Sequence, residues 1–522
     1  MQQGAPNAWV ADKPEAQNGL IILGTPLGQP AFVEAHAMDR LAKEQLLLDR
    51  LGDVGDLQSG WVLLSQSAVP RANHTVRIVP PSLSRLYAAG HDTALWDAFN
   101  KTFGTAGFAG DDLARRVATL PGRMGGMGLR SAERMSEGAY WASWLNTLHV
   151  LLQKTPDVAE RILQDLEQGV AHVACSREAQ QCRQGLVRSG ATDLPTWADG
   201  AVGVAPPAAV DGVDPTDFQR GWQCFACSFS ETNFLEQQVL PLCGDSQKAL
   251  LLSQSGGPAS AWLRAVPSEP AYTLKPLRLQ VAVRRRLRWP LPLAAKQCSR
   301  TCTSQLDSLG DHAASCAQSG RLKLRSRPVE KTWARVLREA GGRVRENVYL
   351  RDTTLPGIDP SDGRNIELVV TGLPVNRGVP LAVDATLVSP LHADGSPLSG
   401  AATRPGTALR NARRLEESTY RELLHSPVLG LLTAGCETGG RLATEAVELV
   451  EAAACARART SPALLRPAAA RAWRYRWLTM LSVVTQDALA ATLVNEGGAL
   501  LDAADAEAPL LVEVVLDGFN GL

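Results

Sequence analysis

Residues 298–316 read CSRTCTSQLDSLGDHAASC and residues 381–390 read LAVDATLVSP, and the rest of the chain is organised around the stretch that these segments bound. The first segment holds two ligand-type pairs with four-residue spacing: Cys298 with Cys302, and His312 with Cys316. Zinc takes four soft or borderline donors in a tetrahedron, which two short-spaced pairs can supply with little backbone strain. The spacing therefore predicts a structural zinc knuckle over residues 297–320. The alternative is a set of unrelated free cysteines beside a surface histidine.

Basic residues are concentrated in the same part of the chain. Between Lys275 and Arg345 there are 17 Lys/Arg against 4 Asp/Glu, although the formal charge of the whole chain is zero. Because phosphates are bound largely through charge, a basic block around a zinc knuckle indicates a surface for nucleic acid. A solvated face is the alternative, and consecutive arginines that repel one another argue against it. The residues expected to bind nucleic acid are Arg284, Arg285, Arg286, Arg288, Arg325 and Arg327.

The overall composition is that of a globular chain with two to four domains. The 522 residues are 45% hydrophobic and 20% charged. No run of about 18 uncharged apolar residues occurs, so we expect no membrane partner. The first residues, MQQGAPNAWVADKPE, lack the basic start and apolar core of a signal peptide, and ten cysteines are too sparse for a disulfide scaffold. A nuclear or cytoplasmic location, rather than secretion, is expected.

The first half of the chain is expected to be mainly helical. GLIILGTPLGQP (19–30) reads as a buried strand with a Gly/Pro turn, and helical spacing follows at 31–51, 83–103, 131–153 and 156–168. We expect one helical region over 1–189, a Gly/Pro-rich linker over 190–215 and a helical connector with a basic end over 216–296. Cys224 and Cys227 form a CxxC without a nearby histidine or a second pair, so a second zinc site is the less favoured interpretation.

The region 321–462 has a different pattern, in which helices and strands alternate. The expected elements are a helix at Glu330–Ala340, strands at Asn347–Arg351, Asn365–Thr371 and Pro380–Val388, a helix at Ala408–Leu424, a strand at 428–435 and a helix at Arg441–Arg459. This α-β-β-β-α-β-α order predicts a small α/β sandwich around a mixed sheet. The remainder, 463–522, is expected to form a long amphipathic helix over Ala468–Asn495 followed by an acidic tail.

Three acidic residues lie at chemically useful positions in this predicted sandwich. Asp384 is in the middle of a strand, Glu367 is in the strand before it, and Glu330 opens the preceding helix. A carboxylate in an apolar strand is unfavourable unless it is paired or binds a metal. Two such groups on adjacent strands make an oxygen-rich site for Mg²⁺, which can activate water and neutralise a phosphodiester. The alternative is that each acid pairs with a nearby arginine.

Several motifs taken together resemble a known family. LGTPLG, GGMGLRSAERMSEGAYWASW, GDHAASC, RNIELVV and AVDATLVSP resemble the C-terminal part of LINE-like non-LTR retrotransposon polyproteins, in the lineage with a restriction-enzyme-like endonuclease behind the reverse transcriptase. The resemblance covers nearly the whole chain. It implies a reverse-transcriptase thumb and connector, a Cys-Cys-His-Cys knuckle, and then a PD-(D/E)xK-type nuclease, with DNA and retroelement RNA as partners. It assigns the two strand acids of that motif to Glu367 and Asp384, and a helix acid used by some members to Glu330.

The chain departs from the family pattern at two kinds of position. The Pro-Asp pair is Ile366-Glu367 here, and Thr386 stands where the family has lysine. The following helix offers Arg413 and Arg414, which can face a phosphate but cannot take a proton from water. The reverse-transcriptase motif of an aromatic residue before paired aspartates is absent, so we expect no polymerase activity from this chain alone. It looks like a fragment or a truncated gene model.

These observations predict a multidomain protein: a mainly α N-terminal half, a small zinc knuckle, an α/β PD-(D/E)xK-like nuclease domain and a C-terminal helix. The predicted function is Mg²⁺-dependent nicking of target DNA for primed reverse transcription. Glu367 and Asp384 would hold the metal, Glu330 would assist, and Arg413 or Arg414 would face the phosphate. The alternative is a catalytically inactive nucleic-acid-binding module or a truncated retroelement relic.

Overall fold

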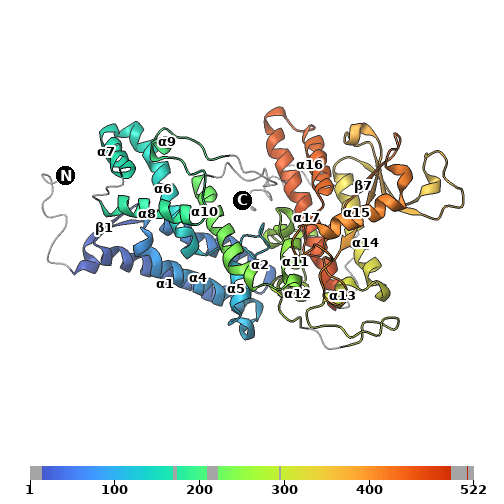
Figure 1. Cartoon of the computed structure of the whole chain (residues 1–522), viewed down its shortest axis with the longest axis horizontal. Helices are drawn as coiled ribbons and strands as arrows, with labels where there is room; N and C mark the ends of the chain where they lie inside the picture. Colours follow the sequence, from blue (N-terminus) through green and yellow to red (C-terminus); the bar gives the residue numbers. More distant parts are fainter. Residues whose placement is uncertain (1–13, 169–172, 208–220, 293–295, 495–513, 515–522) are drawn as a thin grey trace.

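The computed structural model describes residues 14–168, 173–207, 221–292, 296–494 and 514, and the structural statements below refer to these residues. The described chain is mainly helical, with a small mixed sheet in its C-terminal half (Figure 1). The helices of the N-terminal half lie at one end of the long axis, and the sheet with its covering helices lies at the other end (Figure 1).

The N-terminal half is built on three long helices, α1 (Pro30–Leu51), α4 (Pro81–Phe103) and α6 (Ala132–Lys154). The predicted helices 31–51, 83–103, 131–153 and 156–168 are thus each present to within two residues. The shorter helices of this half are α2 (Leu57–Leu63), α3 (Ala72–Ile78), α5 (Asp112–Thr119), α7 (Pro156–Glu167), α8 (Ala174–Arg188), α9 (Trp197–Ala201) and α10 (Trp222–Phe234).

The segment predicted as a buried strand is instead an exposed hairpin. β1 (Gly19–Ile22) pairs antiparallel with β2 (Thr25–Gly28). Leu23 at the turn is 95% exposed, and its φ of 49° lies in the left-handed region. The prediction of burial is wrong because the hairpin pairs only with itself and packs on one side, against α1. An apolar sequence alone does not reveal how many layers cover it.

The predicted linker is also structured in part. Thr196 and Asp199 form a capping box that starts α9, and Trp197 is buried against Trp141 of α6. This indole packs in the same core as Trp222 of α10, so the Gly- and Pro-containing segment contributes a packed helix to the N-terminal half. Residues 208–215 of the predicted linker lie outside the described residues.

The C-terminal half contains the predicted α-β-β-β-α-β-α order. α14 (Arg321–Glu339) precedes a four-stranded sheet with the order β3-β4-β5-β7, in which only β5 and β7 are parallel. The strands are β3 (Arg343–Tyr349), β4 (Asn365–Thr371), β5 (Leu381–Asp384) and β7 (Gly430–Thr433). The flanking elements are α15 (Thr407–Thr419), α16 (Thr444–Ala458), and a small parallel pair of β6 (Leu387–Val388) with β8 (Cys436–Glu437).

Two element boundaries differ from the sequence prediction for physical reasons. The helix expected to start at Glu330 starts at Arg321, because Pro328 interrupts the apparent pattern without ending the helix. The strand expected over Pro380–Val388 is divided, since Asp384 ends β5 and β6 begins at Leu387. This break lies at the carboxyl end of β5, where the acidic residues gather.

The two faces of the sheet pack against different helices. Leu368 and Val383 share a core with Trp333 of α14, whereas Val369 and Ala382 pack with Tyr420, which follows α15. Since side chains alternate along a strand, Glu367 and Asp384 lie on the face of Val369 and Ala382, toward α15.

The long C-terminal helix α17 (Arg466–Val494) occupies the interior rather than the surface. It packs against α12 (Pro276–Arg286), α14 and α16, and it is seen between these helices in Figure 1. The prediction that it is amphipathic is wrong, because neighbours cover it on several sides. Within Ala463–Val494, one window is long and apolar enough to cross a membrane, and 89% of that window is buried inside the fold.

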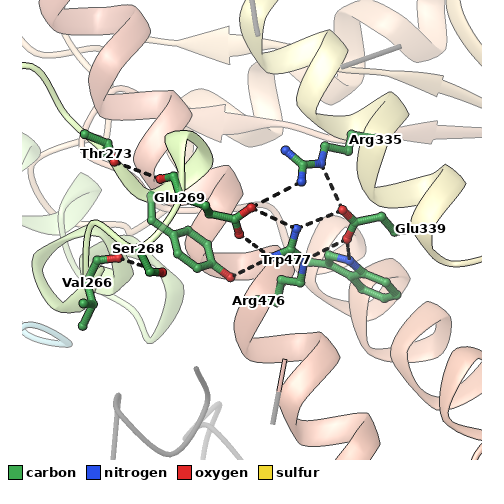
Figure 2. Close-up of polar contacts among 9 residues, drawn as sticks. Val266, Ser268, Glu269, Thr273, Arg335, Glu339, Arg476 and Trp477 are labelled. Carbon is green, nitrogen blue, oxygen red and sulfur yellow. Dashed lines mark hydrogen bonds and ion pairs between the residues drawn. The ribbon is translucent and has the colours of Figure 1, made fainter. Parts of the chain in front are cut away.

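A buried ion network attaches α17 to its neighbours (Figure 2). The guanidinium of Arg476 donates from Nε and Nη2 to Glu339 of α14, each at 3.0 Å, and also pairs with Glu269. Arg335 contacts Glu339 at 3.0 Å and Glu269 at 3.5 Å, and the Trp477 indole donates to Glu339. Every charge in this network has a partner of opposite sign. Because these residues come from the predicted regions 216–296, 321–462 and 463–522, the network joins the three regions.

Candidate functional site

Cys298, Cys302, His312 and Cys316 converge at one buried point. One ligand atom from each lies within 4.8 Å of the others, and the Cys302 sulfur is 3.3 Å from His312 Nε2. Among the residues that the structure describes, this is the one group of three or more His, Cys, Asp or Glu residues with such spacing. Three sulfur donors and one imidazole suit a tetrahedral zinc site, so the cluster could bind a structural zinc ion.

Backbone geometry around the cluster fixes the histidine. Gly310 adopts φ 78° immediately before α13 (Asp311–Ser315), the short helix that carries His312. The carboxylate of Asp307 accepts hydrogen bonds from the backbone N–H of His312 at 2.7 Å and of Asp311 at 3.1 Å. His312 Nδ1 lies 3.0 Å from the carbonyl of Ala393, and a proton donated there leaves Nε2 free for a metal.

The electrostatics also favour a thiolate in the cluster. Hydrogen bonding from the Ser304 backbone lowers the pKa of the Cys302 thiol, with the nearby His312 acting in the same direction. Burial and the neighbouring sulfurs raise the pKa of Cys298. Because metal ligation requires deprotonated sulfur, zinc binding would release protons from these thiols.

The arginine run on α12 lies largely inside the protein. Arg286 is 5% exposed and donates to the carbonyl of Gly126 at 3.0 Å, with longer hydrogen bonds to two other carbonyls. Arg285 and Arg288 both bind the carboxylate of Asp311, at 3.2 and 2.5 Å. The expectation that these arginines face nucleic acid is therefore corrected for Arg285 and Arg286, because both side chains are buried and bind partners within the fold. Arg288 is partly exposed, but its charge is also paired.

The other predicted phosphate-binding arginines differ in exposure. Arg284 donates to the carbonyl of Pro290 and lies over the ring of Phe108 at 5.5 Å. Arg325 is buried, with hydrogen bonds from its two Nη atoms to the carbonyls of Ala314 and Leu387. Arg327, two residues later on α14, is exposed. Of the six predicted residues, Arg327 is thus the one whose guanidinium lies openly at the surface.

The two strand acids are neighbours in the sheet. β4 and β5 pair antiparallel with Leu368 opposite Val383, and continuing this register by one residue places Glu367 opposite Asp384. Directly opposite residues share a face, so both carboxylates point toward α15. A carboxylate oxygen of Glu367 accepts a 2.5 Å hydrogen bond from the backbone N–H of Ala385.

No cation neutralises these two acids within the described structure. Asp384 is 8% exposed, yet its carboxylate has no hydrogen bond or ion pair there, and Glu367 has no ion pair. The alternative in which each acid pairs with an arginine is therefore not the arrangement found. Two further acids, Glu330 of α14 and Glu416 of α15, act through their charges on both strand carboxylates, but the four acids do not form a group with metal-ligand spacing in the described residues.

Burial, and then the charges of neighbouring acids, raise the pKa of both strand acids. For Glu367 the pKa rises through burial and then through the charges of Asp384 and Glu330. For Asp384 it rises through burial and then through Glu416 and Glu330. A divalent cation would reverse this effect, since it stabilises the ionised form of both groups.

The basic residues of α15 are placed differently from the acids. Arg413 pairs with Glu417 at 2.8 Å and also with Glu445 of α16, so its charge is already neutralised. It lines an open pocket of about 790 Å³ together with Thr433, the register partner of Asp384 on β7. Arg414 is exposed, and no ion pair is seen for it in the described part of the chain.

Sequence reasoning missed two residues at this site. Glu416 joins the acids, and burial raises its pKa. Tyr420 donates from its hydroxyl to the carbonyl of Asn365 at 2.6 Å, and burial together with the charges of Asp384, Glu416 and Glu367 raises its pKa to about 12. The four-residue spacing of Ala412 and Glu416 on α15 and of Tyr420, which follows the helix, could have identified both residues.

Comparison with models of known protein families gave no match, and comparison with curated proteins gave no significant match.

Proposed function

We propose that the chain is a divalent-metal-dependent endonuclease of the PD-(D/E)xK type, derived from a LINE-like non-LTR retroelement, that nicks DNA. The observation that carries this proposal is the pair of opposite carboxylates, half-buried Glu367 and buried Asp384, without a neutralising cation in the described residues. Burying like charges side by side is unfavourable unless a metal or protons neutralise them. In this proposal Mg²⁺ is the neutralising ion.

The strand arrangement supports this proposal. Asp384 stands at the carboxyl end of β5, where the chain leaves the sheet, and the parallel neighbour β7 ends at the same edge. A small mixed sheet with helices on both faces and acids at this edge fits the nuclease class that the sequence resembles. The likeness is at the level of element order and acid placement.

Each residue has a chemical task in the proposed reaction. Glu367 and Asp384 would bind the cation, and Glu330 or Glu416, whose charges act on both, would accept a proton or orient bound water. When bound, the cation would polarise the phosphodiester and lower the pKa of its water. Arg414 would contact a phosphate, whereas Arg413 is already paired with Glu417 and Glu445. Thr386 cannot replace the missing lysine as a base, so Glu416 is the better candidate.

A nicking assay tests this function. Supercoiled plasmid incubated with the purified chain should relax to the open circle with Mg²⁺ or Mn²⁺ and stay supercoiled without a divalent cation. Asp384→Asn should abolish nicking, because the neutral amide is a poor ligand for a hard cation. Asp352→Asn is the matched control, since Asp352 is an exposed acid of the same α/β region. Equal nicking by wild type and Asp384→Asn would remove the proposal.

The second candidate is a nucleic-acid-binding module without catalysis. It is favoured by Thr386 in place of the lysine and by the pairing of Arg413 with Glu417 and Glu445, which leave the proposed reaction without a lysine base. On this view the acids are held neutral by shared protons. DNA binding by wild type without nicking under any divalent cation would favour this candidate.

A further inference from the structure

A second open pocket lies between the Cys/His cluster and the α/β region. Its volume is about 710 Å³, within the usual range for small-molecule sites. One wall comes from the knuckle and the start of α14, and the other from β6, the loop after it and α15. His312 lines the pocket and is also hydrogen-bonded to Ala393 of that loop, so the pocket is a fixed part of the fold.

A buried arginine without a counter-ion lines this pocket. Arg325 is 3% exposed, and its Nη atoms donate to two backbone carbonyls, but its Nε–H has no partner. No carboxylate pairs with Arg325 in the described part of the chain. The hydroxyl of Ser315, which also lines the pocket, is likewise buried without a partner. Both residues line the pocket, so a ligand bound there could supply the hydrogen-bond partner that each side chain lacks.

The pocket favours an anionic ligand with a flat apolar part. None of its lining residues is acidic, and the exposed cations Lys323 and Arg414 are next in sequence to lining residues. Leu322, Leu398 and Leu415 supply an aliphatic wall, and the Leu415 side chain is 63% exposed although it lies beside the pocket. A nucleotide combines an apolar ring face, hydrogen-bond acceptors and a phosphate, and unstacked bases are what single-strand-binding proteins bind.

We propose that this pocket holds one nucleotide of a single-stranded nucleic acid, with its base against Leu322, Leu398 and Leu415 and an acceptor atom on Arg325. The choice of nucleic acid as the ligand rests on the proposed function, whereas the pocket is a feature of the structure whatever the function. In this arrangement the zinc knuckle and α15 would contact the same strand, and α15 also carries Glu416, whose charge acts on the strand acids. The protein would therefore require a locally unpaired strand beside the site that it cuts.

Oligonucleotide binding to the full chain tests this site. Fluorescence anisotropy with a labelled single-stranded oligothymidylate and with a duplex of equal length should be compared in zinc-containing buffer without magnesium. Leu415→Asn removes apolar wall without adding charge, and should weaken single-strand binding about tenfold, the change produced by 1.4 kcal/mol. Duplex binding should change much less. Leu464→Asn is the matched control, because Leu464 is 95% exposed and lies outside the pocket.

A second variant addresses the arginine. Arg325→Lys keeps the positive charge but removes Nε–H, and it should weaken single-strand binding provided that its thermal unfolding matches that of wild type. If it misfolds, Leu415→Asn alone decides. Unchanged single-strand binding by Leu415→Asn, or an equal loss for the duplex, would overturn the pocket assignment. Nicking by Asp384→Asn reports on the proposed metal site, and single-strand binding reports on the pocket. Either proposal can therefore be contradicted without affecting the other.

Discussion

The sequence predicts a functional role for two charged regions, the arginine run on α12 and the acids on β4 and β5. The structure gives these two regions different surroundings. The arginine run on α12 is buried, but each guanidinium finds carbonyls or the carboxylate of Asp311. Asp384 on β5 is buried as well and Glu367 on β4 is half-buried, but neither pairs with a cation in the described residues. A buried charge with partners is part of the scaffold, whereas a buried charge without one needs something that the chain does not contain. Whether a buried charged group has a hydrogen-bond or ion-pair partner, rather than its charge alone, therefore separates structural groups from functional ones.

The largest effect on stability is expected at the Cys/His cluster. Its thiolates, like the strand acids, would be neutralised by a bound cation. Cys302→Ser should remove one zinc ion per chain and destabilise the knuckle severely, since structural zinc contributes on the order of 10–16 kcal/mol in small domains. Metal analysis and thermal unfolding measure this. Cys455→Ser is the control, because Cys455 is an exposed free cysteine. Full zinc occupancy in Cys302→Ser would show that the cluster is not a metal site.

The arginine run should respond next. Asp311→Ala removes the carboxylate that pairs with both Arg285 and Arg288 in the described structure. Breaking a buried ion pair from one side is expected to lower the free energy of unfolding by about 3–5 kcal/mol. Chemical unfolding measures the loss. A change below 1 kcal/mol would mean that the run is not part of the scaffold, and the contrast with the acids would disappear.

Neutralising the acids should have the opposite sign. Asp384→Asn removes repulsion in the cluster, so it should leave the metal-free protein as stable as wild type or stabilise it by about 1 kcal/mol. Thermal unfolding without divalent cations measures this. A loss of several kcal/mol would mean instead that Asp384 is a structural partner of an arginine.

The same repulsion predicts a pH dependence. The folded-state pKa values of Glu367 and Asp384 are raised, so the folded state binds more protons than the unfolded state above the ordinary carboxyl range. Stability from these groups is full at low pH and is lost as the pH rises toward the raised pKa values. Wild type should therefore lose stability between weakly acidic and neutral pH relative to a Glu367→Gln, Asp384→Asn double variant. Parallel stability curves for the two proteins would contradict the shifts.

The smallest effect is expected at Arg413. Its pairs with Glu417 and Glu445 are partly exposed, and such pairs contribute about 0–1 kcal/mol. Arg413→Ala should thus change stability little, and should reduce nicking less than Arg414→Ala, whose guanidinium is available for phosphate. Plasmid-nicking rates of the two variants compare them. A greater loss for Arg413→Ala would assign the phosphate contact to the paired residue.

Much of the local structure could be predicted from the sequence. The spacing of Cys298, Cys302, His312 and Cys316 is short-range, and pairs four residues apart can meet wherever the knuckle lies. Apolar periodicity located the long helices and the α-β-β-β-α-β-α order, because it depends only on which face of an element is buried. Strand patterns likewise placed Glu367 and Asp384 on successive strands, whereas the register of β4 against β5 puts the two acids opposite one another.

Only the tertiary structure decided which of these charged groups have hydrogen-bond or ion-pair partners. The carbonyls that bind Arg286 come from residues 122, 126 and 254, and Asp311 lies beyond the end of α12. No local pattern in the sequence reveals such distant partners. The basic run that predicted a nucleic-acid surface is therefore found buried and paired within the fold. Glu416 likewise approached the acids only because α15 covers that face. Periodicity is a property of neighbours along the chain, whereas hydrogen bonding and charge pairing depend on segments that meet only in the folded protein.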